Sequence, residues 1–450
     1  MRGLSRGILL ASGASAALLA LSGAAYAGGF AVREQSAEFQ GMSFAGAAAS
    51  GGGLSGMFWN PAIAAYAPVG IYTESHYSGI FGHVDMTGNT FTTAGTALPL
   101  DPNSGNIAKG AVVPASYMSY RLSEKLVAAL SINSPFGLVT EPSNRIWAGQ
   151  TFARTSEIKT YNFAPTLAYQ LMPTLSIGVG LQIERIEGRL KQAAGVTAPN
   201  QDVNSIIKGD DVGFGFTAGV NWAPTASTSI GLGFRSSINH NLQGTISQVP
   251  TPLGFQGAAI QAGLNLPEIV TLSLRQAVTE RLTILATGEW SHWSRVEKLD
   301  IVCNGNTGPS VLCGATGDGR VITSLPLGWH DGWMTSLGGE YMYSDSLKLR
   351  SGFAYEKSPI QNATERTQRV PDMDRVWASA GATYKWNDKF AFDLAYSHIF
   401  GVGNGDIDRT SGTGATALRF IGKVDSQVDI VSASIKYRFG DVPVAYEPMK

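Results

Sequence analysis

From Pro68 onward, the chain consists of segments in which large apolar residues alternate with small or polar ones, and turn residues separate these segments. The alternation is regular in residues 175–184, 376–386, 390–397 and 431–439. Successive side chains of a β-strand point to opposite faces of the sheet, so a period of two predicts strands with one apolar and one polar face. The chain is therefore predicted to be all-β.

The positions of the charged residues matter here, because a soluble β-sandwich alternates in the same way. Lys385, Asp393 and Lys436 lie on the small, polar face, and the aromatic residues Tyr384 and Trp386 lie close to a predicted strand end. Aromatic residues at strand ends are typical of membrane interfaces, and a closed barrel satisfies the backbone groups of every strand in lipid. We interpret the pattern as a transmembrane antiparallel β-barrel with a polar lumen and an apolar outer face.

The connections between segments alternate between short and long ones. Tight turns, the first at 171–173 and the last at 387–389, are expected at the periplasmic end. Counting the segments predicts about fourteen strands, an even number as in single-chain bacterial barrels. The longer connections are rich in Gly, Thr, Asn and Pro and are expected to be extracellular loops: 84–107, 192–210, 240–264, 299–328, 357–371 and 401–425.

The first 27 residues have the three parts of a secretory signal peptide. Arg2 and Arg6 provide a positive start, residues 7–21 form an apolar run, and residues 25–27 (AYA) offer a cleavage site before Gly28. The alternative, a transmembrane anchor, is weaker because the apolar run is short. The chain is therefore expected to be exported.

The segment that follows, rich in Gly and Ala, does not alternate. An irregular segment cannot face lipid, but it can fold inside a lumen, so we expect a hatch that plugs the barrel. The alternative is a disordered periplasmic tail, although this segment is more apolar than a solvated linker. The predicted organisation is a signal peptide at 1–27, a hatch at 28–67, a transmembrane barrel at 68–439 and a short tail at 440–450.

Composition and cysteine usage exclude several other classes of protein. The 450 residues carry a net charge of −1 with only 15% charged residues, which is no electrostatic footprint for nucleic acid. Cys303 and Cys313 lie in one short segment and are expected to form a disulfide that pins a surface loop, because two thiolates alone would leave a metal half coordinated. The G-x-S-x-G motif at 3–7 leaves with the signal peptide, the G-x-G-x-x-G motif at 51–56 follows no strand, and the six histidines are scattered without metal spacing. We therefore expect no catalytic residues, no metal and no cofactor.

Several stretches together resemble the FadL family of outer-membrane long-chain fatty-acid transporters, over essentially the whole mature chain. The N-terminal stretches are GGFAVREQSAEFQGMSFAGAAA at 28–49, FWNPA at 58–62 and INSPFGLVTE at 132–141. The later ones are PTLAYQLMPTLSIGVGLQ at 165–182, NLPEIVTLSLRQAVTERLTILATGEWSHWS at 265–294, RSGFAYEKSPI at 350–360 and VPDMDRVWASAGATYKWNDKFAFDLAYSHIF at 370–400. One departure is the tail that follows Phe439, where such barrels usually end.

The resemblance implies a fourteen-stranded barrel whose hatch, through Asn60, Pro61 and Ala62, closes the periplasmic end. It also implies that the third strand kinks inward and leaves a lateral exit to the membrane, and the kink maps to four consecutive residues: Ser134, Pro135, Phe136 and Gly137. The residue types support a break independently, since Pro donates no ladder hydrogen bond and Gly tolerates strained backbone. The alternative is an ordinary bulge.

The resemblance further implies that Phe30 lies close to bound ligand, so that a shift of the N-terminus would couple loading to opening. Arg185, Arg189 and Lys191, at the outer end of one predicted strand, are candidates for contacting a carboxylate, with ordinary surface charges as the alternative. The expected protein is a monomeric barrel among the lipids of a Gram-negative outer membrane. It would pass long-chain fatty acids or other hydrophobic ligands by diffusion.

Four alternative functions stay open at this point. The channel could carry aromatic hydrocarbons or other hydrophobic xenobiotics, because the pocket lining is not readable from the sequence. A general polar porin would have an open lumen without a plug. A barrel enzyme acting on lipid, or a structural or adhesin-like barrel, would belong to a different functional class.

Overall fold

The computed structural model describes residues 28–194, 203–249, 257–305, 312–313 and 318–440. The predicted signal peptide and residues 441–450 of the predicted tail lie outside this part of the chain. Within it, one antiparallel sheet closes into a fourteen-stranded barrel, as predicted. The barrel closes where β1 (Ile71–Thr92) pairs with β21 (Leu418–Arg438) along their whole length.

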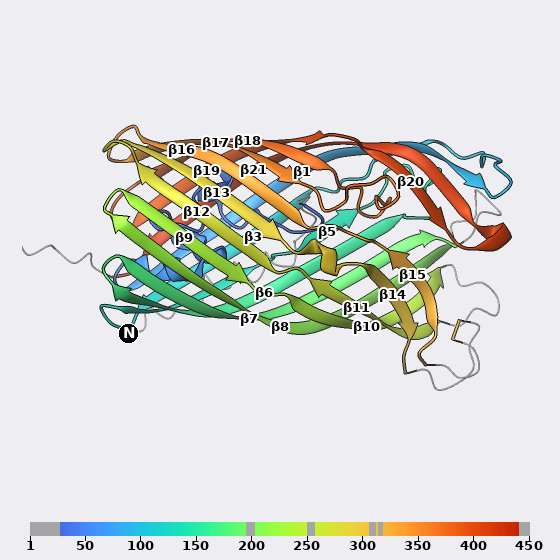
Figure 1. Cartoon of the computed structure of the whole chain (residues 1–450), viewed down its shortest axis with the longest axis horizontal. Helices are drawn as coiled ribbons and strands as arrows, with labels where there is room; N and C mark the ends of the chain where they lie inside the picture. The colour runs from blue at the N-terminus through green and yellow to red at the C-terminus, as the bar shows by residue number, and fades with distance from the viewer. Residues whose placement is uncertain (1–27, 195–202, 250–256, 306–311, 314–317, 441–450) are drawn as a thin grey trace, which may run out of the picture.

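The strands of the barrel wall follow one another in chain order and are inclined to the long axis (Figure 1). The uninterrupted wall strands besides β1 and β21 are β3 (Ala111–Arg121), β6 (Thr155–Met172), β7 (Leu175–Ala193), β8 (Asn204–Thr225), β17 (Leu347–Lys357), β18 (Asp374–Lys385) and β19 (Phe390–Val402). Five further wall strands are each divided in two. They are β4 (Leu126–Asn133) with β5 (Gly137–Thr140), β9 (Thr228–Arg235) with β10 (Ile238–Val249), β11 (Ala258–Leu266) with β12 (Ile269–Ala277), β13 (Leu282–Ser291) with β14 (Lys298–Cys303), and β15 (Val321–Pro326) with β16 (Gly332–Met342).

The expected loops were partly wrong. Residues 240–249 and 258–264 lie in β10 and β11, and residues 299–303 and 321–326 lie in β14 and β15. β1, β8 and β21 also run into the stretches 84–107, 192–210 and 401–425. The short strands β2 (Asn103–Asn106) and β20 (Asp406–Ser411) likewise lie within expected loops and pair with β1 and β21. Ladder hydrogen bonds do not need an apolar face, so strands that leave the membrane can be polar and rich in Gly and Thr.

The wall has an apolar outer face, as the alternation predicts. Leu167, Val179 and Phe214 on neighbouring strands are about half or more exposed, whereas the alternate residues Ser176 and Gln182 are fully buried. Among the described residues, none of the helices is long and apolar enough to cross a membrane. The disulfide between Cys303 and Cys313 joins the end of β14 to the segment after it.

Residues 28–67 fold inside one end of the barrel, as the blue segment in Figure 1. This hatch contains α2 (Ala37–Gln40) and the 3₁₀ helices η2 (Leu54–Phe58) and η3 (Pro61–Tyr66). Asn60 caps η3: its side-chain oxygen accepts from Ala62 N at 3.0 Å. Its amide donates to Ala48 O at 2.7 Å and to Val220 O of β8 at 3.0 Å, so this cap also fastens the hatch to the wall.

Glycines on the inner face of the wall allow this close packing. A Cβ on Gly231 would lie 1.7 Å from Ala48 O, and a Cβ on Gly233 would lie 1.8 Å from Trp59 O. Distances this short are impossible for real atoms, so only glycine fits where the backbone of the hatch meets the strands. The glycine content of the chain is thus explained in part by a plugged lumen.

Candidate functional site

The third strand of the wall is broken where the sequence predicts a kink. β4 ends with Asn133 opposite Asn162, and β5 begins with Gly137 opposite Lys159. The strand therefore uses one residue more than its partner across the break, which is the definition of a bulge. The broken strand is held to β6 because Ser134 Oγ donates to Thr160 O at 2.7 Å and Phe136 N donates to Thr160 Oγ1 at 3.0 Å.

On its other side, the third strand leaves its neighbour. β3 pairs with β4 only from Ser116, opposite Ile132, to Arg121. Farther along, an isolated bridge joins Ala108 to Thr140. Between these two points, no pairing joins β3 to β5 in the described part of the chain. The wall therefore has an interruption there, bounded by paired backbone at both ends.

The N-terminal segment takes the place of the missing neighbour. Val32 N donates to Pro135 O at 2.8 Å, and Gly137 N donates to Phe30 O at 2.8 Å. Gln35 adds a side-chain hydrogen bond to Ser134 O at 2.7 Å. On this side, the kinked strand is thus paired with the hatch inside the barrel instead of with β3, and it stays paired with β6 on the other side.

Phe30 is the centre of an aromatic cluster at this point. Its ring centroid lies 4.8 Å from that of Trp293, 5.7 Å from that of Trp329 and 6.0 Å from that of Phe136, and all four rings are buried. Edge-to-face arrangements of this kind stabilise aromatic pairs beyond their buried area. The structure thus brings together Phe30 and the kink, two features that the sequence analysis selected separately.

The charges that hold the N-terminal segment are buried. Gly28 N lies 2.7 Å from Glu356 Oε1, and the Arg33 guanidinium pairs with Glu356 at 3.0 Å and with Glu289. Burial would lower the pKa of Arg33, but these two carboxylates raise it above its usual value. Glu34 next to it is fully buried, neither of its oxygens has a hydrogen-bond partner among the described residues, and burial raises the pKa of its carboxyl to about 7.

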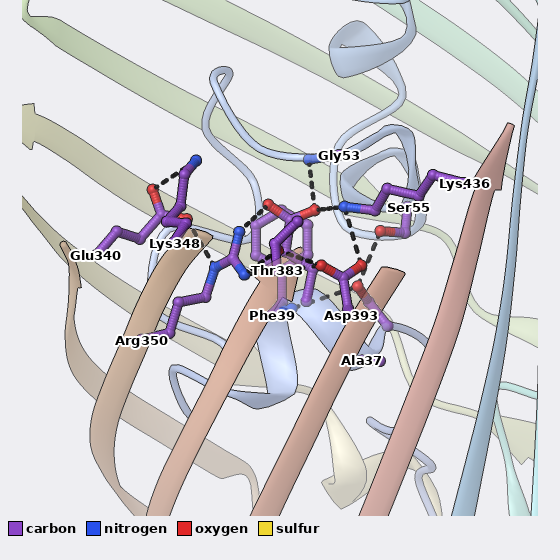
Figure 2. A network of polar contacts seen from close by, with 12 residues as sticks. Ala37, Phe39, Gly53, Ser55, Glu340, Lys348, Arg350, Thr383, Asp393 and Lys436 are labelled. Atoms are coloured by element: carbon purple, nitrogen blue, oxygen red, sulfur yellow. Dashed lines mark hydrogen bonds and ion pairs between the residues drawn. The ribbon is translucent and has the colours of Figure 1, made fainter. Parts of the chain in front are cut away.

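A second set of buried charges fastens the hatch near the tight turns (Figure 2). Glu38 of α2 contacts Arg350 of β17 at 3.0 Å and Lys436 of β21, and it accepts from Gly53 N at 3.0 Å. Lys436 also lies 3.0 Å from Asp393. Although burial alone would raise the pKa of Glu38, the neighbouring cations hold it well below its usual value. The carboxylate of Glu38 is therefore charged and links two wall strands to the plug.

Farther from the hatch, the lumen becomes apolar. A cavity there is lined by inward-facing side chains of β6, β7, β8, β10, β11 and β14: Ile158, Ile186, Leu190, Ile207, Leu242, Ile260, Leu264, Leu299 and Ile301. The sequence analysis did not select these residues. A signal was present, because the inward positions of β7 change from small or polar residues at 176–184 to Ile186 and Leu190.

The three proposed carboxylate contacts lie elsewhere. Arg185, Arg189 and Lys191 have the same strand parity as Ile183, which puts them on the outer face of the wall and not in the lumen. Arg185 pairs there with Glu187 and with Asp210, each at 3.1 Å. The structure therefore does not bring them together with Phe30.

A buried cation that the sequence analysis missed lies beside the kink. Arg235, the last residue of β9, lines a small cavity with Val32 and Pro135. Its guanidinium donates to Phe58 O at 3.0 Å and to the side-chain oxygen of Gln182, both neutral groups. No ion pair of Arg235 is present among the described residues, so its charge is available to an anion.

Comparison with known proteins gives consistent results. Residues 18–439 match the family described as outer membrane protein transport protein (OMPP1/FadL/TodX). A long-chain fatty acid transport protein of Escherichia coli O6:H1 is 27% identical, over 91% of this chain and 94% of that protein. Outer membrane protein P1 of Haemophilus influenzae is 25% identical, over 86% and 88% of the two chains.

Solved structures show the same fold. The crystal structure of a Pseudomonas aeruginosa FadL homologue superposes with a TM-score of 0.79 at 23% identity, and covers 92% of this chain and 100% of that one. The Pseudomonas putida toluene transporter TodX superposes with a TM-score of 0.61 at 16% identity, with coverages of 90% and 98%. At these identities, the likeness concerns the fold alone.

Proposed function

We propose, from the premise that this chain belongs to the OMPP1/FadL/TodX family of outer membrane transport proteins, that it is a passive channel for long-chain fatty acids with a lateral exit. Its place is the outer membrane of a Gram-negative cell. The observation that supports the proposal concerns the third strand, whose second part, β5, pairs with the N-terminal segment instead of with β3. β5 is paired with the N-terminal segment, so the wall beside β3 is closed only while Phe30 and Val32 stay in position.

The ligand would move through regions of the lumen that differ in polarity. The apolar cavity between β7 and β11 suits an acyl chain, for which burial is worth roughly 0.8 kcal/mol per CH₂. Arg235 lines a cavity with Val32 and Pro135, and both of its hydrogen-bond acceptors are neutral, so we assign the carboxylate to it. The acyl chain would then lie close to Phe30 and the kink.

Release requires the N-terminal segment to move. The movement breaks the hydrogen bonds between Val32 and Pro135 and between Gly137 and Phe30, and it separates the ring of Phe30 from three other rings. A ligand that replaces Phe30 among these rings would lower the cost of that movement. The ligand itself thus opens the exit, and diffusion down a gradient supplies the direction.

The hatch supports this route over a straight passage to the periplasm. Asn60, Pro61 and Ala62 form the start of η3 and hold the plug against β8, and Glu38 holds it against β17 and β21. A filled lumen also disfavours a general polar porin. We further propose that the barrel acts as a monomer, without catalytic activity.

The test is uptake of labelled oleate by a deletion strain that carries wild type or Gly137→Arg. A side chain on Gly137 would meet Val32 at 3.3 Å, so arginine there should fill the exit and reduce oleate uptake to the level of the empty strain. Gly263→Arg is the matched control, because Gly263 on β11 faces outward with nothing within 4 Å of its Cβ. Full uptake by Gly137→Arg, with both variants folded, would refute the lateral exit.

The second candidate substrate is an aromatic hydrocarbon, favoured by the ring cluster around Phe30. The same strains distinguish the two, if labelled toluene is supplied beside oleate. An Arg235→Gln variant should lose oleate uptake and retain toluene uptake, because only the fatty acid has a carboxylate to neutralise. Equal loss of both would remove Arg235 as the carboxylate partner.

A further inference from the structure

The outer face of the barrel changes from apolar to charged at one height on three neighbouring strands. On β7 the outward residues are apolar from Leu175 to Ile183, and they are charged from Arg185 onward. Nine residues of an inclined strand span about 20–25 Å, which is close to the height of the apolar band of an outer-membrane barrel. The tight turn before β7 is at the end that holds the hatch, so the charges lie at the outer interface of the membrane.

These charges surround a hollow on the outer wall, with a volume of about 370 Å³. It is formed by β6, β7, β8 and β10, and its lining includes Gly188, Gly209 and Gly244. Four cations and three carboxylates line it: Lys159, Arg185, Arg189 and Lys208, and Glu157, Glu187 and Asp210. Lys191 lies one outward position beyond Arg189.

All three carboxylates form ion pairs with only two of the four cations. Lys159 pairs with Glu157 at 2.5 Å, and Arg185 bridges Glu187 and Asp210. Arg189 and Lys208 form no ion pair within the described part of the chain, and the Arg189 Nε is buried without a hydrogen-bond partner there.

Arg189 lies opposite Lys208 in the β7–β8 ladder, and on its other side it lies opposite Glu157, the partner of Lys159. Two like charges directly opposite on neighbouring strands destabilise the pairing unless an anion lies between them. Salt screens the attraction of these two cations for a free monovalent anion. An anion that is itself held in the membrane is not diluted into the solution. The geometry therefore calls for an anionic group of the lipid phase.

We propose that this hollow binds a phosphate group of the phosphorylated glycolipid (lipid A) that forms the outer leaflet of the membrane. The phosphate would lie between Arg189 and Lys208, where two cations can share its oxygens. The acyl chains would then lie along the apolar band directly below, on Ile183 and Phe214, which pair across β7 and β8. The phosphorylated headgroup would thus contact the charged hollow, and the acyl chains would contact the apolar band below it.

The opposite side of the barrel provides a contrast. At the corresponding level, the outward residues of β1 and β21 include Asp85, Asp425 and Asp429, with Lys423 as the nearby cation. A surface with this balance repels phosphate. The proposed glycolipid site is therefore a property of the wall at β6, β7, β8 and β10 that β1 and β21 do not share.

The test measures lipid A that is retained by the full-length protein in nanodiscs, by native mass spectrometry. Lipid A with both phosphates and dephosphorylated lipid A are the two probes. We expect wild type to retain the phosphorylated form at least about tenfold better, since each basic residue near an anionic surface contributes about fivefold. R189E/K208E should remove this preference, and K423E, the matched control on the acidic wall, should keep it.

Retention of both lipids to the same extent by wild type, or an unchanged preference in R189E/K208E, would overturn the proposal. R189Q/K208Q provides a milder variant if charge reversal prevents folding, which is checked by heat-modifiable migration on gels. Displacement of lipid A by millimolar inorganic phosphate would also contradict the proposal, because it would show a site for the free ion. Oleate uptake is expected to stay normal in these variants, which separates this site from the proposed transport route.

Discussion

The two halves of β7 have opposite amphipathicity. From Leu175 to Glu184, polar and small side chains face the lumen and apolar ones face outward, whereas beyond Glu184 the lumen side is Ile186 and Leu190 and the outer side is charged. The strand and its hydrogen-bond ladder continue unchanged through the reversal. Backbone pairing and side-chain polarity are therefore set independently. Polarity follows what each face touches, which is hatch and lipid in one half and, under the two proposals above, apolar ligand and headgroups in the other.

The largest expected effect, on the conductance of the barrel, comes from forcing the hatch out of the half of the barrel that it fills. In Gly231→Val, the new Cβ would collide with the Ala48 carbonyl, which belongs to the backbone and is not the flexible end of a side chain. Overpacking of this severity costs more than about 3 kcal/mol, so we expect an open lumen with ion conductance in planar bilayers.

Gly263→Val is the control for that experiment, because its Cβ meets nothing within 4 Å. A Gly231→Val channel that stays as closed as wild type would show that the hatch is not packed against β9 as described.

The second effect concerns the buried ion network between hatch and wall. Glu38→Ala leaves Arg350 and Lys436 near each other with one carboxylate fewer. Removal of one partner from a buried ion network costs about 3–5 kcal/mol. The measurement is the urea concentration at which the purified barrel unfolds in detergent micelles.

Glu365→Ala is the comparison for this loss, since Glu365 forms a half-exposed pair with His330 outside the hatch. Equal destabilisation by the two substitutions would mean that the network does not hold the hatch.

How far the sequence predicts this molecule depends on the range of each interaction. The strands follow from local alternation, and the break at Pro135 follows from local chemistry. Arg185 lies two residues after Ile183 on β7, so the alternation that predicts the barrel also puts Arg185 on the outer face. The prediction that Arg185 contacts the ligand in the lumen conflicted with this alternation. In contrast, the contact between Gly28 and Glu356 joins residues 328 positions apart, and no local pattern encodes it.

A smaller, pH-dependent effect is expected at the N-terminal segment. The pKa of Glu34 rises from 4.5 to about 7 on burial, so the seated segment binds its proton more tightly than a released one. The free energy of seating should therefore weaken by about 3 kcal/mol as the pH rises from about 4.5 to 7, and it should stay constant above that. Hydrogen-exchange protection factors of residues 28–36 report this, and Glu34→Gln should remove the pH dependence. A wild-type profile as flat as that of the variant would contradict it.

The smallest expected effect concerns the other half of the barrel, where the lumen beyond Glu184 of β7 is apolar. Leu190 faces the apolar lumen, and the outward-facing Glu187 lies three residues before it on the same strand. Leu190→Asn removes part of the apolar surface that an acyl chain would cover, at a cost of about 1 kcal/mol, so oleate affinity should fall roughly fivefold. Glu187→Gln changes the opposite face and should leave affinity unaltered. If the two substitutions have the same effect, the reversal on β7 does not mark a ligand-binding lumen, and the apolar residues there serve packing alone.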